Sequence, residues 1–153
     1  MNGHIPVLLE ECIKYLNIKP DGVYVDGTLG MGGHSEAILQ RLTTGRLISI
    51  DRDAVAISRA GERLQPYPDR LTIVHGNFRD LDAILDEQGI SLVDGMLFDL
   101  GVSSPQLDEA DRGFSYMTDA PLDMRMDSSD NIDAWFIVNR WPQEKIERIL
   151  RDY

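Results

Sequence analysis

Residues 26–34 have the sequence DGTLGMGGH and lie between an apolar run at residues 23–25 and a helical pattern that begins near Ser35. This order predicts a strand that ends in a glycine-rich turn and leads into the N-terminus of a helix. Glycine lets the backbone approach a ligand closely, and the N–H groups of a helix N-terminus point outward. We therefore expect a nucleotide-like cofactor to bind here.

A second apolar run, residues 47–50, is closed by Asp51, which lies 21 residues after Gly30. In a doubly wound α/β unit, an acidic residue at the end of the second strand meets the ribose hydroxyls at about this spacing. The two features therefore point to the same kind of site.

Apolar runs alternate with helical patterns along the first two thirds of the chain. Strands are expected at residues 23–25, 47–50, 71–74 and within 93–101, and helices at residues 6–16, 35–42, 54–64 and 81–87. Such alternation predicts parallel strands joined by right-handed crossovers, with ligands at their carboxyl ends. Asp26, Asp51, residues 75–78 and Asp99 fall on that rim.

The composition fits one globular domain with a core, since 42% of the 153 residues are apolar and 7% are aromatic. The single cysteine, Cys12, excludes an internal disulfide framework, and we find neither a secretion signal nor a membrane span. We therefore expect a cytoplasmic protein. The net charge of −11 has the wrong sign for a free-standing nucleic-acid binder, so basic surface would have to come from elsewhere.

After Gly101 the pattern changes to a long loop rich in Ser, Pro, Asp and Gly that runs to residue 130. Loops of this length in compact domains are usually functional or disordered. Two short helices are expected after the loop, at residues 132–139 and 143–151.

Three stretches of the second half carry a family resemblance: residues 99–108 (DLGVSSPQLD), 112–115 (RGFS) and 121–127 (PLDMRMD). They closely resemble the RsmH (also called MraW) family, and the resemblance starts at His4 and continues to the end of the chain. Members of this family are S-adenosylmethionine-dependent methyltransferases that act on the exocyclic N4 amine of a cytosine in bacterial small-subunit (16S) ribosomal RNA.

The resemblance implies a Rossmann-like class I methyltransferase sheet of parallel strands with flanking helices. Residues 1–105 would be the cofactor-binding half of that domain, and residues 106–153 the long loop and first helices of an inserted helical domain. Family members are longer than this chain, so the resemblance implies a truncated form with an incomplete sheet. We expect such a form to be weakly active or inactive, and to form a homodimer through the exposed edge of the fourth strand.

The resemblance also implies a set of cofactor contacts, namely Gly32, Gly33, His34, Asp51, Phe78, Asp99 and Gln106. Physical alternatives remain for several of them. The glycines can serve the turn alone, Phe78 can belong to the core, and His34 can be an ordinary first-turn histidine. Asp53, just beyond the second strand, is interpreted as a helix cap.

Asp99 and Pro105 are the candidate catalytic residues. A cytosine amine is a poor nucleophile, so the site must accept hydrogen bonds from its N–H groups and align its nitrogen with the methyl group. Asp99 is the carboxylate at the tip of the fourth strand, and Pro105 and neighbouring carbonyls can complete the acceptor set. Asp99 can instead hold the amino end of the cofactor.

The long loop holds the candidate RNA contacts. The target base must leave its stack, and Arg112, Phe114 and Tyr116 can stack on it or on neighbouring nucleotides. Phe114 and Tyr116 can equally pin the loop to the core. Arg125 can bind phosphate, or it can form an ion pair within the chain with a flanking aspartate.

Two other functions fit part of the sequence. A non-catalytic module that binds S-adenosylmethionine would explain the missing strands, and a nicotinamide oxidoreductase would use the glycine turn and Asp51 but leave residues 99–106 unexplained. No metal site is expected, because His4, His34 and His75 are far apart in the sequence and Cys12 has no cysteine partner.

Overall fold

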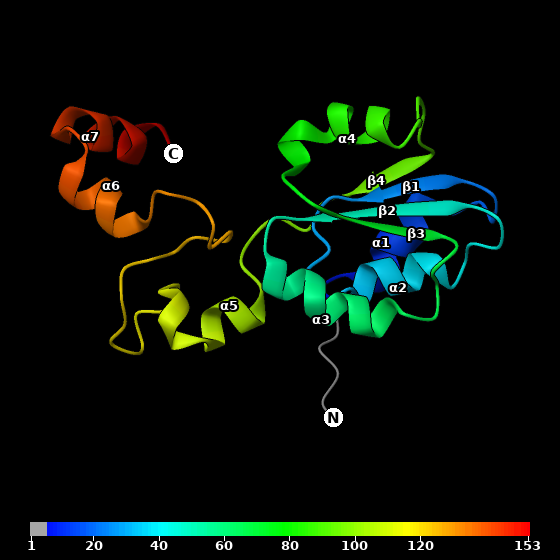
Figure 1. The fold of residues 1–153 in the computed structure, drawn as a ribbon, viewed down its shortest axis with the longest axis horizontal. Helices are drawn as coiled ribbons and strands as arrows, with labels where there is room; N and C mark the ends of the chain where they lie inside the picture. The colour runs from blue at the N-terminus through cyan, green and yellow to red at the C-terminus, as the bar shows by residue number, and fades with distance from the viewer. Residues whose placement is uncertain (1–5) are drawn as a thin grey trace. The chain divides into compact units, whose positions relative to one another are not determined.

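The computed structural model describes residues 6–153, so His4 lies outside the described part. The chain forms two compact units, Met1–Gly101 and Val102–Tyr153. The first unit contains the sheet and the second contains short helices joined by loops (Figure 1).

The sheet of the first unit has four parallel strands in the order β3-β2-β1-β4. Their bounds are β1 Val23–Asp26, β2 Arg46–Asp51, β3 Leu71–His75 and β4 Gly95–Leu97. The chain moves outward from β1 to β3 and then returns to place β4 on the other side of β1. This reversal confirms the predicted Rossmann-like α/β fold and puts the switch point, where such folds bind ligands, between β1 and β4.

Helices cover both faces of this sheet (Figure 1). The helices α1 Leu9–Leu16, α2 Gly33–Leu39 and α3 Ala54–Leu64 lie on one face, and α4 Leu81–Glu87 lies on the other. A short 3-10 helix, η1 Phe78–Asp80, leads into α4. All four α-helices fall where apolar periodicity predicts them.

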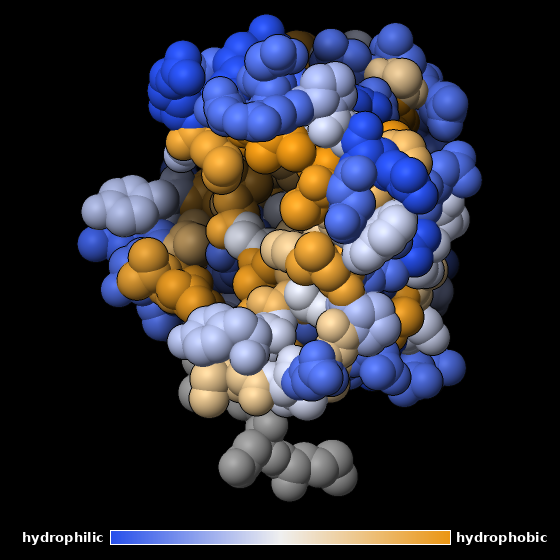
Figure 2. Space-filling model, turned by 90° about the vertical axis from the view of Figure 1, so that its left-hand side faces the viewer, coloured by the Kyte–Doolittle hydropathy of each residue, from blue (hydrophilic) through white to orange (hydrophobic). Residues whose placement is uncertain are grey.

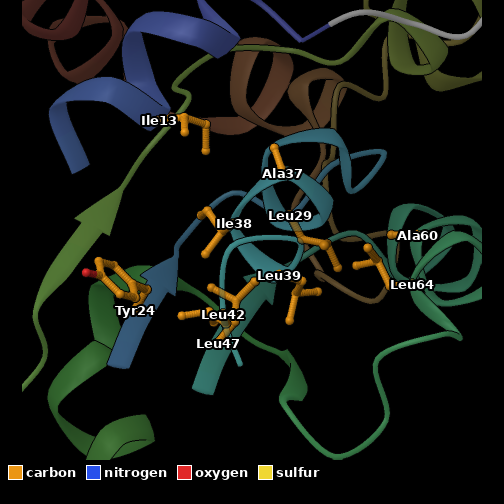
Figure 3. Packing of buried hydrophobic residues seen from close by; sticks show 10 residues of the cluster. All are labelled: Ile13, Tyr24, Leu29, Ala37, Ile38, Leu39, Leu42, Leu47, Ala60 and Leu64. Carbon is orange, nitrogen blue, oxygen red and sulfur yellow. The ribbon is translucent and has the colours of Figure 1, made fainter. Parts of the chain in front are cut away.

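The buried core is divided by the sheet into two clusters, because successive strand residues face opposite sides. Tyr24 and Leu47 belong to the cluster under α1, α2 and α3, which Figure 3 shows with its ten labelled residues. Val25 and Ile48 belong to the other cluster, together with Ile84 of α4. Near-continuous apolar runs such as residues 47–50 are therefore explained by burial on both faces.

The fourth strand is shorter than the sequence predicts. It ends at Leu97, whose carbonyl accepts the Gly27 N–H at 2.9 Å, and Phe98 and Leu100 beyond it are exposed. The Asp99 N–H bonds to the side chain of Thr28 instead of to a strand carbonyl. The ladder therefore stops two residues before the carboxylate.

The second unit contains more helix than the sequence predicts. Its elements are α5 Ser104–Asp108, η2 Ala110–Arg112, α6 Ala134–Arg140 and α7 Gln143–Asp152. The last two match the predicted helices to within two residues, but α5 and η2 lie in the stretch expected to be loop. A capping box between Ser103 and Gln106 starts α5, with proline in its first turn.

Apolar side chains remain open to solvent in both units, and Figure 2 shows such residues on one face of the molecule. Met96 on β4 is 45% exposed, and Tyr116 and Leu150 in the second unit are more exposed still. Within residues 6–153 no helix is both long enough and apolar enough to cross a membrane.

Candidate functional site

The carboxyl ends of the strands bring three of the rim carboxylates into the first unit's candidate site. Asp26 ends β1 and Asp51 ends β2, while Asp99 follows β4 by two residues. The glycine-rich turn lies directly after β1 and leads into α2. Its N–H groups at Gly27 and Leu29 bond to carbonyls of β4 and β2, so the turn is fixed across the switch point.

Two glycines of the turn adopt the left-handed backbone conformation, with φ of +50° at Gly30 and +76° at Gly32. A side chain would be strained at either position. A Cβ at Gly32 would also lie 3.2 Å from the Cβ of Ala60 on α3. The structure thus gives Gly32 a turn and packing role, which is compatible with a cofactor contact through its backbone.

Asp51 is held by two backbone donors. The Gly30 N–H donates to Oδ2 at 2.7 Å, and the Asp53 N–H donates to Oδ1 at 2.9 Å. The spacing noted in the sequence therefore becomes a direct contact between the turn and the acid. Each oxygen keeps a further lone pair, so the oriented carboxylate can accept two hydroxyl groups of a ribose.

Asp53 caps the helix that follows β2. Its Oδ1 accepts the Val55 N–H at 2.9 Å at the start of α3, and its side chain is buried. The predicted capping role is confirmed, and a cofactor role is not needed to explain this acid.

His34 lies buried in the first turn of α2, between the N-terminal segment and Asp99. Its Nε2 is 3.1 Å from the Val7 carbonyl oxygen, and its Nδ1 is 3.9 Å from Asp99 Oδ2. Because a carbonyl only accepts, Nε2 carries a proton there and Nδ1 faces the carboxylate. A cationic group placed between Nδ1 and the Asp99 carboxylate would be favourable to both.

Gly33 meets the same N-terminal segment. A Cβ at this position would lie 2.3 Å from the Pro6 ring, so the close approach of Pro6 requires glycine. This packing accounts for Gly33 by itself, and its predicted contact with a cofactor stays a prediction.

Phe78 and Phe98 form an aromatic pair beside the turn. Their ring centroids are 5.3 Å apart at 65°, and the two side chains are 40% and 41% exposed. Phe98 lies over Gly27, where a Cβ would come 2.2 Å from the ring. Phe78 is therefore outside both buried clusters, and the pair offers a flat apolar ligand an open surface.

Asp26 is the acid that the sequence does not single out as a site residue. It is wholly buried, and its carboxylate accepts the Ser35 hydroxyl at 2.6 Å and the Thr28 N–H at 3.1 Å. Ser49 lies opposite Asp26 in the sheet register and bonds to Ser35 at 2.8 Å. Burial raises the pKa of the Asp26 carboxyl above its ordinary value, while the hydrogen bonds oppose that rise.

Asp99 is placed by its backbone while its side chain stays half-exposed. Its N–H donates to Thr28 Oγ1 at 2.7 Å, and 53% of its side chain is accessible. A carboxylate in this position can accept N–H groups from a bound amine. The structure therefore allows either role predicted for Asp99, acceptor for the target amine or partner of a cofactor's amino end.

Gln106 and Pro105 belong to the second unit. The Gln106 Oε1 accepts the Ser103 N–H at 3.0 Å as part of the capping box, and Pro105 lies in the first turn of α5. These contacts explain why both residue types start a helix. Their predicted roles toward cofactor and amine stay predictions.

Arg125 is engaged within its own loop. Its Nε and Nη2 donate to the Asp123 carboxylate at 2.8 and 2.6 Å, and its Nη1 donates to the carbonyls of Ser128 and Asp130. The guanidinium holds the pKa of the Asp123 carboxyl below its ordinary value. Of the two alternatives for Arg125, the ion pair within the chain is the one that forms.

The other loop candidates differ in exposure. Tyr116 is 96% exposed and Phe114 is half-buried, while Arg112 Nη2 donates to the carbonyls of Arg125 and Met126. Tyr116 is thus available for stacking, and Arg112 braces the loop.

Within the described part of the chain, no three His, Cys, Asp or Glu side chains gather as they would around a metal ion.

Sequence reasoning placed Asp26 on the rim of the sheet without giving it a role, and it did not single out Thr28 or Phe98. For Asp26 and Thr28 a signal was present, because an aspartate two residues before the N–H it accepts is a common turn motif. For Phe98 the signal is the ring that directly precedes Asp99, but its contact with Gly27 depends on the pairing of β1 with β4.

Comparison with known proteins assigns these features to a family. The model of the MraW methylase family matches residues 1–153. Curated relatives with the name "Ribosomal RNA small subunit methyltransferase H" include those of Clostridium botulinum (strain Kyoto / Type A2), 57% identical over 98% of this chain and 48% of the relative, and of Brevibacillus brevis, 55% identical over 96% and 47%. The chain spans about half the length of the curated relatives it matches.

Solved structures support the fold alone. A Clostridium thermocellum protein proposed to be an rRNA methylase aligns with a TM-score of 0.57 and 23% identity, over 65% of this chain and 54% of that one. A SAM-dependent O-methyltransferase from Thermotoga maritima aligns with a TM-score of 0.52 and 16% identity, over 65% and 38%.

Proposed function

Because the chain belongs to the MraW methylase family, we propose that it forms the cofactor site of a methyltransferase that transfers a methyl group from S-adenosylmethionine to small-subunit ribosomal RNA. The observation that carries the proposal is the orientation of the Asp51 carboxylate. One of its oxygens accepts a backbone N–H of the glycine turn, and the other accepts a backbone N–H just before α3. The rest of the site offers complementary surfaces for the other parts of such a cofactor.

The donors and acceptors present fit S-adenosylmethionine. Asp51 would bind the ribose diol, and the exposed ring of Phe78 would cover the adenine. Asp99 and His34 Nδ1 would hold the positively charged amino group between them. The backbone of Gly32 and Gly33 would border the same site.

Catalysis in this proposal depends on positioning and on hydrogen-bond acceptors. When bound, S-adenosylmethionine supplies a methyl group on a positively charged sulfur. In the other role proposed for Asp99, its half-exposed carboxylate at the switch point accepts an N–H of the target amine in place of the cofactor's amino group and orients the nitrogen lone pair. We propose Pro105, in the first turn of α5, as the second catalytic residue.

We propose the exocyclic N4 amine of a cytosine in 16S ribosomal RNA as the acceptor, and the cytoplasm as the place of the reaction. The names of the curated relatives, which specify the small ribosomal subunit, support the RNA class. The half-exposed Asp99 carboxylate, which can accept N–H groups, supports an amine as the acceptor group. Tyr116 would stack on the base or on a neighbouring nucleotide once the base leaves its stack.

We also propose that two copies associate through the edge of β4. Within the described residues β4 is an edge strand of the sheet, and its Met96 is 45% exposed. An unpaired strand edge with apolar side chains favours pairing with another strand. Light scattering across a concentration series would detect the dimer, and Met96→Lys should weaken it.

The experiment for the proposed function is methyl transfer to small ribosomal subunits that lack the modification. Label from methyl-tritiated S-adenosylmethionine should appear at the cytosine N4 and should be lost in Asp99→Asn, with Arg79→Gln at an exposed surface site as the matched control. Cofactor binding without transfer would support the non-catalytic alternative. Binding of NAD in preference to S-adenosylmethionine would overturn the proposal.

A further inference from the structure

Thr28 joins the buried floor of the glycine turn to Asp99. Its N–H donates to Asp26 Oδ1 at 3.1 Å, and its Oγ1 accepts the Asp99 N–H at 2.7 Å. Thr28 therefore contacts two of the three rim aspartates: its backbone N–H bonds to the Asp26 carboxylate, and its side chain bonds to the backbone N–H of Asp99. Thr28 is half-buried, so this bridge lies at the surface of the switch point.

Burial and hydrogen bonds hold the Asp26 carboxylate, to which the Thr28 N–H donates, in one position. Asp26 is wholly buried at the end of β1, and its other oxygen accepts the Ser35 hydroxyl of α2 at 2.6 Å. Ser35 is itself bonded to Ser49 of β2 at 2.8 Å. The Thr28 N–H thus bonds to a carboxylate that is tied to two strands and one helix.

The Asp99 end needs such support. The β4 ladder ends with the bond from the Gly27 N–H to the Leu97 carbonyl, and Asp99 lies two residues beyond it. Gly101, two residues further on, adopts a φ of +146°. The Thr28 hydroxyl oxygen takes the place of the next strand carbonyl and fixes the backbone from which the Asp99 carboxylate projects.

We propose that Thr28 is a positioning residue that sets the affinity of the site for the amino-acid end of the cofactor by holding the backbone of Asp99. The inference rests on the proposed function, because it takes Asp99 as the partner of that amino group. Thr28 acts here through Asp99. Removing its hydroxyl oxygen leaves the Asp99 N–H without that acceptor and frees the carboxylate to move.

The test compares Thr28→Val, which keeps the shape of threonine but lacks the oxygen, with Thr28→Ser, which keeps the oxygen. Calorimetry would measure the binding of S-adenosylmethionine and of 5′-methylthioadenosine, which lacks the amino-acid end. We expect Thr28→Val to weaken S-adenosylmethionine binding by about tenfold and to leave 5′-methylthioadenosine binding unchanged within about twofold. Thr28→Ser should resemble the wild type with both ligands.

Hydrogen exchange on the same proteins gives a readout that does not need the cofactor. In Thr28→Val the Asp99 amide should exchange about tenfold faster. The Leu29 amide, which bonds to the Ile50 carbonyl in the same turn, should keep its protection and show that the fold is intact.

Equal weakening of both ligands in Thr28→Val, or no weakening of either, would overturn the inference. A wild-type chain that bound neither ligand would instead refute the proposed function. In that case the exchange rates alone would decide the contact, and an unchanged rate at Asp99 would refute it.

Discussion

Replacing Asp26 with asparagine tests how the buried carboxylate under the glycine turn contributes to stability. In the wild type this carboxylate accepts the Ser35 hydroxyl and the Thr28 N–H while wholly buried. Asparagine has the same shape, and its oxygen can still accept the Thr28 N–H. Its amide group can donate to Ser35, whose hydroxyl then turns toward Ser49.

Two opposing contributions set the size of the effect. Hydrogen bonds to a charged group stabilise by about 1.5–3 kcal/mol each, and Asp26 accepts two. Burial of a carboxylate costs several kcal/mol, and the raised pKa of Asp26 shows that this cost is the larger. We therefore expect the free energy of unfolding of Asp26→Asn to lie within about 2 kcal/mol of the wild-type value at neutral pH. Asp26→Ala opens a cavity and leaves both donors without their acceptor, so its free energy of unfolding should fall by about 3–5 kcal/mol.

The pH dependence gives the sharper result. Because the folded-state pKa of Asp26 is raised above its ordinary value of 3.8, its favourable contribution is complete below that value and is lost as the pH rises through the folded pKa. The wild type should therefore be most favoured over Asp26→Asn in acid, and this advantage should fall as the pH rises. Urea unfolding followed by circular dichroism, at pH values from about 3 to 8, measures the free energy of unfolding of both proteins. In the difference between the two values, the contributions of the other titrating groups cancel.

The opposite slope would refute this reasoning. If the wild type gained stability over Asp26→Asn as the pH rose, the hydrogen bonds would outweigh burial and the folded pKa of Asp26 would lie below 3.8. A difference that did not change with pH would mean that Asp26 has the same pKa in both states.

Three further substitutions probe the elements around the site. Gly61→Ala should stabilise the protein by about 0.5–1 kcal/mol, because Gly61 lies in α3 and a Cβ there meets nothing within 4 Å. Gly89→Ala should destabilise it, because Gly89 has a φ of +67°. If the urea midpoints of both variants shifted in the same direction, this reasoning would be wrong. Asp53→Ala should cost about 1 kcal/mol through the lost α3 cap, and thermal melting with no change would refute that role. Arg125→Met should free the loop that the bonds from Arg125 Nη1 to the Ser128 and Asp130 carbonyls close, and should speed limited proteolysis there; an unchanged cleavage rate would contradict this role.

The sheet was predictable from the sequence because its inner strands are buried on both faces. Residues 23–25 and 47–50 are apolar except for Ser49, and the structure places them in the two central strands. Asp51 was predictable because the length of one strand, turn and helix fixes its separation from Gly30. Such local spacing carries over directly into contacts.

The end of β4 and the start of α5 were harder to predict. Apolar residues such as Phe98 and Leu100 continue the strand pattern, but the Thr28 hydroxyl captures the next N–H and ends the ladder. The capping box at Ser103 and Gln106 is a local signal for α5, but the surrounding Ser, Pro, Asp and Gly residues favour a loop when composition alone is considered. Contacts across the fold decided the first case, and side-chain capping decided the second.

Asp26 and Thr28 lie two residues apart in the glycine-rich stretch, so the turn bond between them has a local signal. The role of Thr28 toward Asp99 could not be predicted from spacing, because that bond joins residues 71 positions apart. It forms only because β4 returns to the far side of β1. The sequence indicates which residues can bind a cofactor, and the strand order determines which of them meet.

The proposed cofactor site is tested best by a calorimetric titration of the wild-type chain and of Asp51→Ala with S-adenosylmethionine. We expect micromolar binding to the wild type and at least tenfold weaker binding to Asp51→Ala, because the ribose would lose both of its oriented acceptors. Equal affinities of the two proteins would refute the proposed site, since the cofactor would then bind without the Asp51 carboxylate.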